Sequence, residues 1–503
     1  MVWGQVNNNG TSLFNNTIKQ LKENATESLF LIPTFIPINE NNAVEFSQGL
    51  SMNTSLTELY MHGHELGEQG LIEIGKSIRN HPNLKTISIG NSEIGLNLIG
   101  LQSLLTNVLK SKNLRNIDFS KQSINSKSLS VINDIFKEGE GNNNNLTYLN
   151  FGENQLDSES LLYLEGIIKS NENIEFLNIG GNQITKFTDS FIQSIIDNGK
   201  QLKKLVLSAN PLKDNSDDDN NDSIGKHISK LLLNSSGLKE IELNDCELNE
   251  RSCKIIGESL LNWKGTSFTA TGNSLMGSSL TSSWLSLSSS SSSSYSNNIK
   301  HLSLRGCFIG DQGVKSIMNA ISMGVLPNLN LLDVAYNKLT LESLVALNSL
   351  VIIDSTTSKP LHYIEYLDAS FNKFGCETKE IIIGWIKSNK ITQLKCLSLN
   401  NVGMKFLDTF EISKVLVDNS DTTSLKLLEL MGNDQIDEIE MAKYQEKQKD
   451  EKERLKEESS KIQKGEEEEE NVNEEEGEED VYEVLSENID VLKREKKLVF
   501  KWK

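Results

Sequence analysis

The stretch LKKLVLSANPL, residues 202–212, decides the fold of this chain. Its apolar residues are Leu202, Leu205 and Leu207, followed by Asn210 and Leu212. The stretch LKEIELNDCEL, residues 238–248, keeps this spacing with a cysteine in place of the asparagine. Alternating apolar residues predict a short strand with one face toward a core. The asparagine or cysteine that follows fits a small interior slot, where an Asn side chain can bond to the backbone of a tight turn.

The same pattern recurs thirteen times between Leu56 and Gln435, with apolar residues at offsets 0, 3, 5 and 10 and most often Asn or Cys at offset 8. The offset-8 residues are His64, Ser92, Gln122, Asn154, Asn182, Asn210, Cys246, Asn273, Cys307, Asn337, Asn372, Val402 and Asn433. They follow one another at steps of 27 to 36 residues, which is a period typical of solenoids. Between them, apolar residues at helical spacing, such as Leu71, Ile74 and Ile78, predict one helix per repeat. The weakest copy is the one counted at Asn273, where Gly265 replaces the first leucine.

This pattern resembles the leucine-rich repeat. The repeat length and the segments LGEQG at 66–70 and IGDQG at 309–313 are similar to the ribonuclease-inhibitor-like subfamily. The resemblance covers about three quarters of the chain and implies an α/β solenoid, or horseshoe, with parallel strands on the concave face and helices on the convex face. Because that subfamily includes inhibitors, scaffolds, sensors and GTPase activators, the resemblance indicates the fold and leaves the function open.

The pattern also predicts how the chain is divided. We expect an N-terminal cap with a degenerate repeat at 1–55, in which Leu13, Phe14, Ile18 and Leu21 have helical spacing. The solenoid of about thirteen repeats follows at 56–436, with loop insertions at 213–224 and 276–297. We expect an acidic tail at 437–480, helical at first and then disordered, and a terminal amphipathic helix with a basic segment at 481–503. That last segment could dock on the solenoid as a cap, bind a partner or an acidic membrane, or act as a nuclear-import signal.

Composition narrows the class of protein. The 503 residues carry a formal net charge of −20, and residues 434–480, with 21 acids and 8 bases, hold −13 of it. The N-terminus lacks the features of a secretory signal, and no apolar run is long enough to span a membrane. The five cysteines are an odd number, as expected for reduced thiols. We therefore expect a soluble monomer in the cytoplasm, with a nuclear location left open and membrane binding the least favoured alternative.

The binding surface is predicted at offsets 2 and 4, whose side chains point away from the core. These 26 positions hold seven acids and one base, which disfavours a nucleic acid and suits a protein partner with a basic surface. Aromatic residues would act as anchors there. The predicted binding residues are Glu58, Tyr60, His62, Asp118, Tyr148, Phe176, Glu240, Glu242, Arg305, Asp333, Tyr366 and Asp368.

The sequence predicts a non-enzyme. It contains no phosphate-binding loop, nucleophile elbow, His-Glu-x-x-His or Cys-x-x-Cys motif, so we expect no catalytic residues, no cofactor and no metal. Our interpretation is an intracellular protein-interaction scaffold or adaptor. As an alternative, repeats that run into a Glu-rich tail resemble the Ran GTPase-activating proteins. That resemblance implies a small GTPase as the partner, with Asn154 near its active site.

Overall fold

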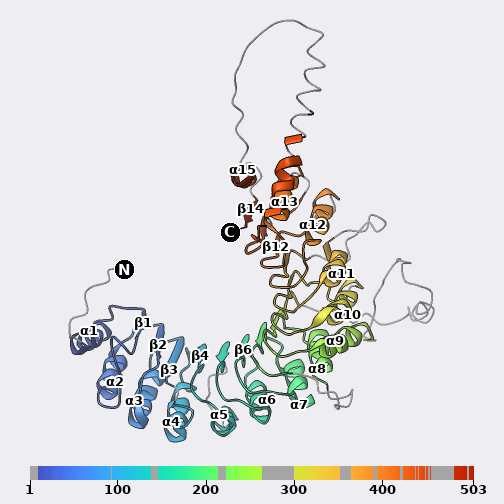
Figure 1. Ribbon diagram of the computed structural model, residues 1–503. Helices are drawn as coiled ribbons and strands as arrows, with labels where there is room; N and C mark the ends of the chain where they lie inside the picture. Colours follow the sequence, from blue (N-terminus) through green and yellow to red (C-terminus); the bar gives the residue numbers. More distant parts are fainter. Residues whose placement is uncertain are drawn as a thin grey trace. The chain divides into compact units, whose positions relative to one another are not determined.

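Short parallel strands alternate with helices along the chain in the computed structural model (Figure 1). The structure describes all residues except 1–9, 92, 138–144, 213–222, 263–298, 324, 352–363, 389–392, 420–422, 437, 440, 448, 451–453, 455–480, 495–497 and 503. The chain divides into two units, unit 1 (Met1–Leu329) and unit 2 (Asn330–Lys503).

Unit 1 is built from one strand and one helix per repeat. Its strands are β1 (Ser28–Phe30), β2 (Glu58–His62), β3 (Thr86–Gly90), β4 (Asn116–Asp118), β5 (Tyr148–Asn150), β6 (Phe176–Asn178), β7 (Lys204–Val206), β8 (Glu240–Glu242) and β9 (His301–Ser303). Its helices are α1 (Gly10–Lys22), α2 (Ala43–Met52), α3 (Gly67–Arg79), α4 (Leu98–Val108), α5 (Ser126–Lys137), α6 (Leu161–Ser170), α7 (Asp189–Asn198), α8 (Ile224–Asn234), α9 (Glu250–Asn262) and α10 (Gly310–Ser322). The strands pair in parallel in chain order, and Figure 1 shows the helices of this unit on the outer side of a bent row of strands.

Unit 2 continues the same alternation. Its strands, again parallel and in chain order, are β10 (Leu331–Asp333), β11 (Tyr366–Asp368), β12 (Cys396–Ser398), β13 (Leu427–Glu429) and β14 (Val499–Lys501). Its helices are α11 (Leu341–Val351), α12 (Thr378–Lys387), α13 (Phe406–Asn419) and α15 (Val481–Arg494). The predicted α/β solenoid of parallel strands and helices is thus confirmed.

Burial follows the predicted alternation. The middle residue of each short strand is buried, as for Leu149 and Leu205, while its two neighbours are mostly half-exposed. On α3, the residues Leu71, Ile74 and Ile78 are buried against the strand layer. The core is therefore a line of apolar residues shared between consecutive repeats, as expected for a solenoid.

The offset-8 residues form a hydrogen-bonded ladder inside the turns. Asn154 Nδ2 donates to the carbonyl oxygens of Phe151 and Phe119, and Asn154 Oδ1 accepts from the N–H groups of Gln122 and Ile124 in the preceding repeat. Asn182, Asn210, Asn372 and Asn433 repeat this geometry. Each side chain links two repeats by satisfying backbone groups that would otherwise be buried without partners. At the two cysteine positions, the Sγ atoms of Cys246 and Cys307 donate to the carbonyls of Leu207 and Leu243.

One of the thirteen predicted copies, the one counted at Asn273, falls outside the described residues. Strand β8 pairs directly with β9, with Glu240 beside His301. That copy has Gly265 where the fold needs a leucine to fill the core, and its residues lie outside the described part of the chain.

The predicted insertions lie almost wholly outside the described residues, at 213–222 and within 263–298. The predicted end of the first insertion, at residue 224, was two residues too late. Ser223 is the N-cap of α8, where its side chain accepts a hydrogen bond from the Lys226 N–H, and Ile224 is the first helical residue.

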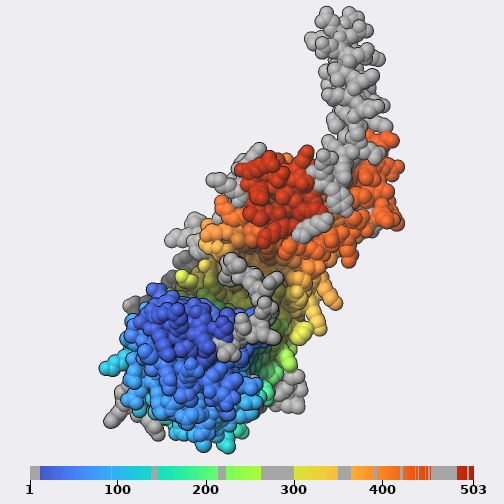
Figure 2. All heavy atoms as spheres, turned by 90° about the vertical axis from the view of Figure 1, so that its left-hand side faces the viewer, coloured from blue at the N-terminus to red at the C-terminus, as the bar shows by residue number. Residues whose placement is uncertain are grey.

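Each unit ends in a cap at one terminus of the chain. In unit 1, α1 precedes β1, and Phe14, Ile18 and Leu21 are buried as predicted, while Leu13 is exposed. In unit 2, α15 contacts α13 and β14 pairs with β13, so the docked alternative for the last segment is confirmed (Figure 2, red). The glutamate runs of the predicted acidic tail, 466–470 and 474–476, lie outside the described residues. No helix among the described residues is long and apolar enough to cross a membrane.

Candidate protein-binding faces

The strand face of unit 1 carries nine of the twelve predicted binding residues. All nine are partly exposed: Glu58, Tyr60, His62, Asp118, Tyr148, Phe176, Glu240, Glu242 and Arg305. Register places equal offsets side by side, so Tyr148, Phe176, Lys204 and Glu240 form one row across four strands. Within this continuous face, two neighbouring groups differ in character, one on β1 to β6 and the other on β7 to β9.

The first group, which we call the aromatic–acidic patch, contains two stacked ring pairs and the acids beside them. Phe30 stacks on Tyr60 with ring centroids 4.5 Å apart and planes 8° from parallel, and Tyr148 stacks on Phe176 at 4.3 Å and 3°. Phe30, 63% exposed, was missed because it precedes the first complete repeat. Phe30 could have been predicted as part of this face, because it lies in a strand-like stretch of the sequence. The structure places it beside Tyr60, in the row of offset 4.

Asp118 lies between these two pairs in the strand order. Burial raises the pKa of Tyr60 above its ordinary value, helped by the negative charges of Glu58 and Asp118. Burial likewise raises the pKa of Tyr148, and Asp118 again adds to the shift. Among the described residues neither Glu58 nor Asp118 forms an ion pair. The patch therefore presents negative charge flanked by apolar rings.

The second group is an internally compensated ion-pair cluster. Lys204 Nζ lies 2.5 Å from Glu242 and 3.4 Å from Glu240, and His301 Nδ1 lies 3.2 Å from Glu240. These contacts raise the pKa of Lys204 against the opposing effect of burial, which is the largest single influence. The two glutamates thus have cationic or titratable partners within the chain, which reduces what they offer to another molecule. This pairing was predictable, because Lys204 and Glu240 share offset 2 in consecutive repeats.

The offset-4 acids have a structural role that the sequence analysis missed. Asp118, Asp333 and Asp368 each accept, through Oδ1, the backbone N–H two residues later, at 2.9 to 3.0 Å. Asn150 and Asn178 make the same bond with Gly152 and Gly180. Aspartate and asparagine are therefore equivalent for the turn, and only the aspartates add charge to the face.

In unit 2, the three predicted residues Asp333, Tyr366 and Asp368 lie on β10 and β11. Tyr366 is 39% exposed, and the two aspartates are half-exposed. Just beyond these strands, Tyr336 and Phe371 stack with ring centroids 4.0 Å apart and planes 11° from parallel. Both rings were missed, because they stand at offset 7 and only offsets 2, 4 and 6 were considered.

Asn154, the residue that the Ran GTPase-activator resemblance singled out, belongs to the interior ladder. Asn154 is 8% exposed. Its side-chain oxygen and nitrogen both form hydrogen bonds with the backbone, either of its own repeat or of the preceding one. That assignment was wrong, since the side chain is fully used in holding the turn and does not face a partner.

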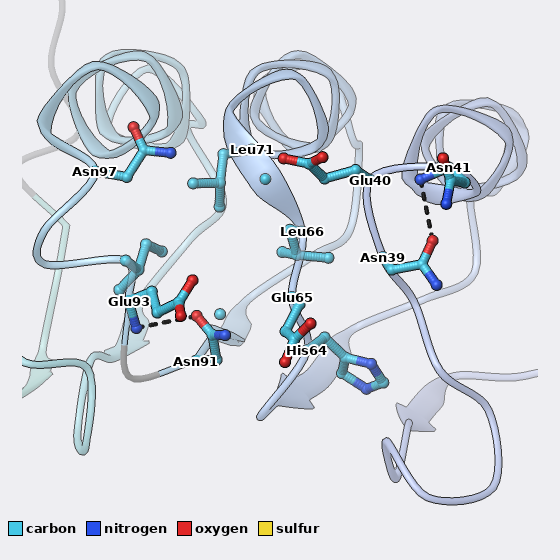
Figure 3. A pocket seen from close by; sticks show the side chains of 13 residues that line it. Asn39, Glu40, Asn41, His64, Glu65, Leu66, Leu71, Asn91, Glu93 and Asn97 are labelled. Carbon is cyan, nitrogen blue, oxygen red and sulfur yellow. Dashed lines mark hydrogen bonds between the residues drawn. The ribbon is translucent and has the colours of Figure 1, made fainter.

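A hollow between the first repeats of unit 1 is lined by three carboxylates, those of Glu40, Glu65 and Glu93, and by the buried His64 (Figure 3). Asn39 and Asn91 accept backbone N–H bonds from Asn41 and Glu93 within this hollow. In the described part of the chain, no group of three or more His, Cys, Asp or Glu side chains is arranged to hold a metal ion.

Comparisons with known proteins agree with this geometry. A family model described as a leucine-rich repeat matches residues 142–164 and 295–318. A comparison with curated proteins gives no match. The repeated strand and helix, the asparagine ladder and the matched segments give the chain the fold of a leucine-rich-repeat solenoid.

Three solved structures show similar folds. The chain is 15% identical to a chain of the TLR13–ssRNA13 complex, with 76% of this chain and 44% of that chain covered and a TM-score of 0.38. It is 16% identical to a chain of the yeast Rad7–Elc1 complex, covering 77% and 89% with a TM-score of 0.29. It is also 16% identical to an internalin from Listeria monocytogenes, covering 69% and 91% with a TM-score of 0.29. The chain thus spans less than half the length of the first of these, and the likeness concerns the fold alone.

Proposed function

We propose that the protein is an interaction scaffold that binds a basic protein surface on the strand face of unit 1. Leucine-rich repeats and other solenoids commonly use their extended strand face for binding. We also propose that its repeats belong to the ribonuclease-inhibitor-like type, because each described repeat of unit 1 carries a full helix.

The aromatic–acidic patch is the observation that carries this proposal. Stacked, partly exposed rings offer apolar contact area that is already ordered, so little conformational entropy is lost when a partner covers them. Asp118 and Glu58, which have no ion-pair partner in the described residues, would attract and orient a basic surface. The compensated cluster at Glu240 and Glu242 is a weaker candidate for the same task.

The experiment compares the proteins captured from source cells by the full chain and by a variant carrying Asp118→Asn and Tyr148→Leu. The first change keeps the bond to the Ser120 N–H and removes the charge, as Asn150 shows one repeat later. The second removes one stacked ring and keeps an apolar residue. We expect captured proteins with basic surfaces, and at least a tenfold weaker capture by the double variant.

The matched control is Glu242→Gln, which alters a carboxylate already paired with Lys204 and should reduce capture much less. Equal capture by the wild type and the double variant would refute the proposal. We do not propose the GTPase-activator alternative, because Asn154, the residue on which it depended, lies in the interior of the fold.

A further inference from the structure

Basic side chains gather at the edge of unit 1 where its strands begin. Offset 1 is the position directly before each strand, and strand register brings the offset-1 residues of consecutive repeats side by side. From β1 to β9 these residues are Glu27, Thr57, Lys85, Arg115, Thr147, Glu175, Lys203, Lys239 and Lys300. This edge thus holds five bases and two acids, whereas the strand face beside it carries more acids than bases.

The basic charge is densest at the start of β7, β8 and β9. The N–H of Lys239 donates to the carbonyl of Lys203 at 2.8 Å, and the N–H of Lys300 donates to the carbonyl of Lys239 at 2.7 Å. These three lysines are therefore neighbours on strands about 4.8 Å apart. Gly237 lies so close to the carbonyl of Lys200 that there is no room for a Cβ atom, which places Lys200 beside them. We call Lys200, Lys203, Lys239 and Lys300 the lysine row.

Most of the charge of the lysine row has no partner among the described residues. All four side chains are exposed. Lys203 Nζ lies 2.6 Å from the carboxylate of Glu175 and forms an ion pair with it. In the part of the chain that the structure describes, Lys200, Lys239 and Lys300 form no ion pair. Three ammonium groups are therefore available to an anion.

The turn before each strand does not require a lysine at offset 1. Thr147 and Glu175 stand at this offset in other repeats, and their N–H groups make the same backbone bond, to the carbonyls of Arg115 and Thr147, at 2.8 Å each. Like charges on neighbouring strands repel one another, so adjacent lysines lower the stability of the fold. The lysine row is therefore better explained by binding than by folding.

We propose that the lysine row binds an extended acidic segment of a partner protein. Such a segment would lie across the starts of the three strands and present a carboxylate on one side at every second residue, about 6.6 Å apart. The flexible lysine stems can follow this spacing. The row is only one residue deep, because Glu240 and Glu242 lie on the strand face next to it. A nucleic-acid duplex, which is much wider than a peptide strand, would bring phosphates against these carboxylates.

The test measures the binding of a fluorescein-labelled peptide of eight glutamates to the full chain, by fluorescence polarisation at about 20 mM salt. The chain has a formal net charge of −20, so its overall field repels this peptide and binding requires a local basic site. We expect saturable binding that weakens as the salt concentration rises. Lys239→Gln with Lys300→Gln should lower the affinity at least fivefold, without lowering the melting temperature, because both side chains are exposed.

The matched control is Lys127→Gln with Lys186→Gln. These lysines of unit 1 are also exposed and form no ion pair in the described residues, but they lie near the N-terminal ends of α5 and α7, beyond the other ends of the strands. The control removes the same charge and should leave the affinity for the peptide nearly unchanged. Absence of saturable binding by the wild type, unchanged binding by the Lys239 and Lys300 variant, or an equal loss in both double variants would each overturn the assignment.

A labelled oligonucleotide of twelve thymidines, alone and in a duplex with its complement, is the second probe. If either form binds more tightly than the peptide and loses this binding in the Lys239 and Lys300 variant, the row binds nucleic acid and the peptide assignment is overturned. The proposal does not depend on the proposed function, because it concerns another surface of unit 1. Asp118→Asn with Tyr148→Leu should leave the affinity for the acidic peptide unchanged, so the two proposals can fail separately.

Discussion

His64 shows how one residue in the ladder can make folding depend on pH. It fills the slot that asparagine fills in other repeats, and it is 1% exposed. The Ile38 N–H donates to Nδ1, so Nδ1 must be unprotonated, and Nε2–H donates to the carbonyl of Leu31. Burial lowers the pKa of His64, with a further contribution from His62. The neutral ring is therefore the form that the fold stabilises.

Replacing His64 by glutamine, which fills the equivalent slot at Gln122, should reduce the pH dependence of stability. Below the ordinary histidine pKa of about 6.5 the unfolded chain takes up a proton that the folded chain does not, so stability falls as the pH falls. We expect the wild type to lose more free energy of unfolding than His64→Gln between pH 7.5 and pH 5, by at most about 2 kcal/mol. Urea unfolding at both pH values measures this. Because His81 is also buried with a lowered pKa and remains in both proteins, only the difference between the proteins is diagnostic. Parallel losses would contradict the role given to His64.

At the scale of the element, the C-terminal segment protects the last repeat. Strand β14 pairs with β13, its Phe500 is 5% exposed, and Leu485 and Leu492 of α15 are fully buried. Lys501 Nζ also lies 2.7 Å from Glu429, whose pKa is lowered by this contact and by the Ser398 hydroxyl, against the raising effect of burial. An exposed β13 edge would be a site for unwanted strand pairing.

The two neighbouring residues of β14 provide a matched pair of substitutions. Phe500→Ala removes a buried ring and should destabilise the cap by about 3–5 kcal/mol. Val499→Ala alters a side chain that is 43% exposed and should change stability by less than about 0.5 kcal/mol. Hydrogen exchange of the β13 amides is the measurement, with faster exchange expected only for Phe500→Ala. Similar exchange in both variants would mean that β14 does not protect the edge of β13.

Features that depend on the residues of a single repeat could be predicted from the sequence, whereas features that depend on the folded backbone could not. The buried strand residues and the helix stripes follow from side-chain periodicity within one repeat, as for Leu205 and for Ile74 on α3, and they were predicted correctly. The weak copy at Asn273 was accepted because its later residues fit the pattern, although Gly265 stands where the pattern has a leucine. The turn bond of Asp118 was missed because its acceptor role depends on backbone geometry that the residue type alone does not reveal.

The sequence predicted where the candidate site lies, but it only partly predicted which of its acids form ion pairs and which rings stack. Offsets 2 and 4 do lie on the strand face, as Tyr60 and Tyr148 show. The division of the acids into a patch without ion pairs and a compensated cluster arises from contacts between repeats, such as Lys204 with Glu242. Comparing equal offsets in consecutive repeats would have revealed the stacked pairs Tyr148–Phe176 and Tyr336–Phe371, because register brings them together.

For the whole molecule, the unequal distribution of charge is the dominant feature. Residues 434–480 hold −13 of the formal net charge of −20, so about two thirds of the excess lies outside the repeats. Net charge affects how often a basic partner arrives through long-range attraction, whereas contacts at the face decide how long it stays. We therefore expect the acidic segment and the strand face of unit 1 to have separable effects on binding.

The last prediction concerns the glutamate runs at 466–470 and 474–476. Changing all eight residues to glutamine should lower severalfold, at low ionic strength, the association rate of the basic partner proposed to bind the aromatic–acidic patch, because long-range attraction is reduced. The dissociation rate of this partner should not change, because the rings and carboxylates of the patch are intact. Stopped-flow fluorescence at about 20 mM and 1 M salt measures both rates, and the difference should disappear at 1 M, where the Debye length is only about 3 Å. A faster dissociation of the partner from the variant would show instead that the glutamate runs contact it directly.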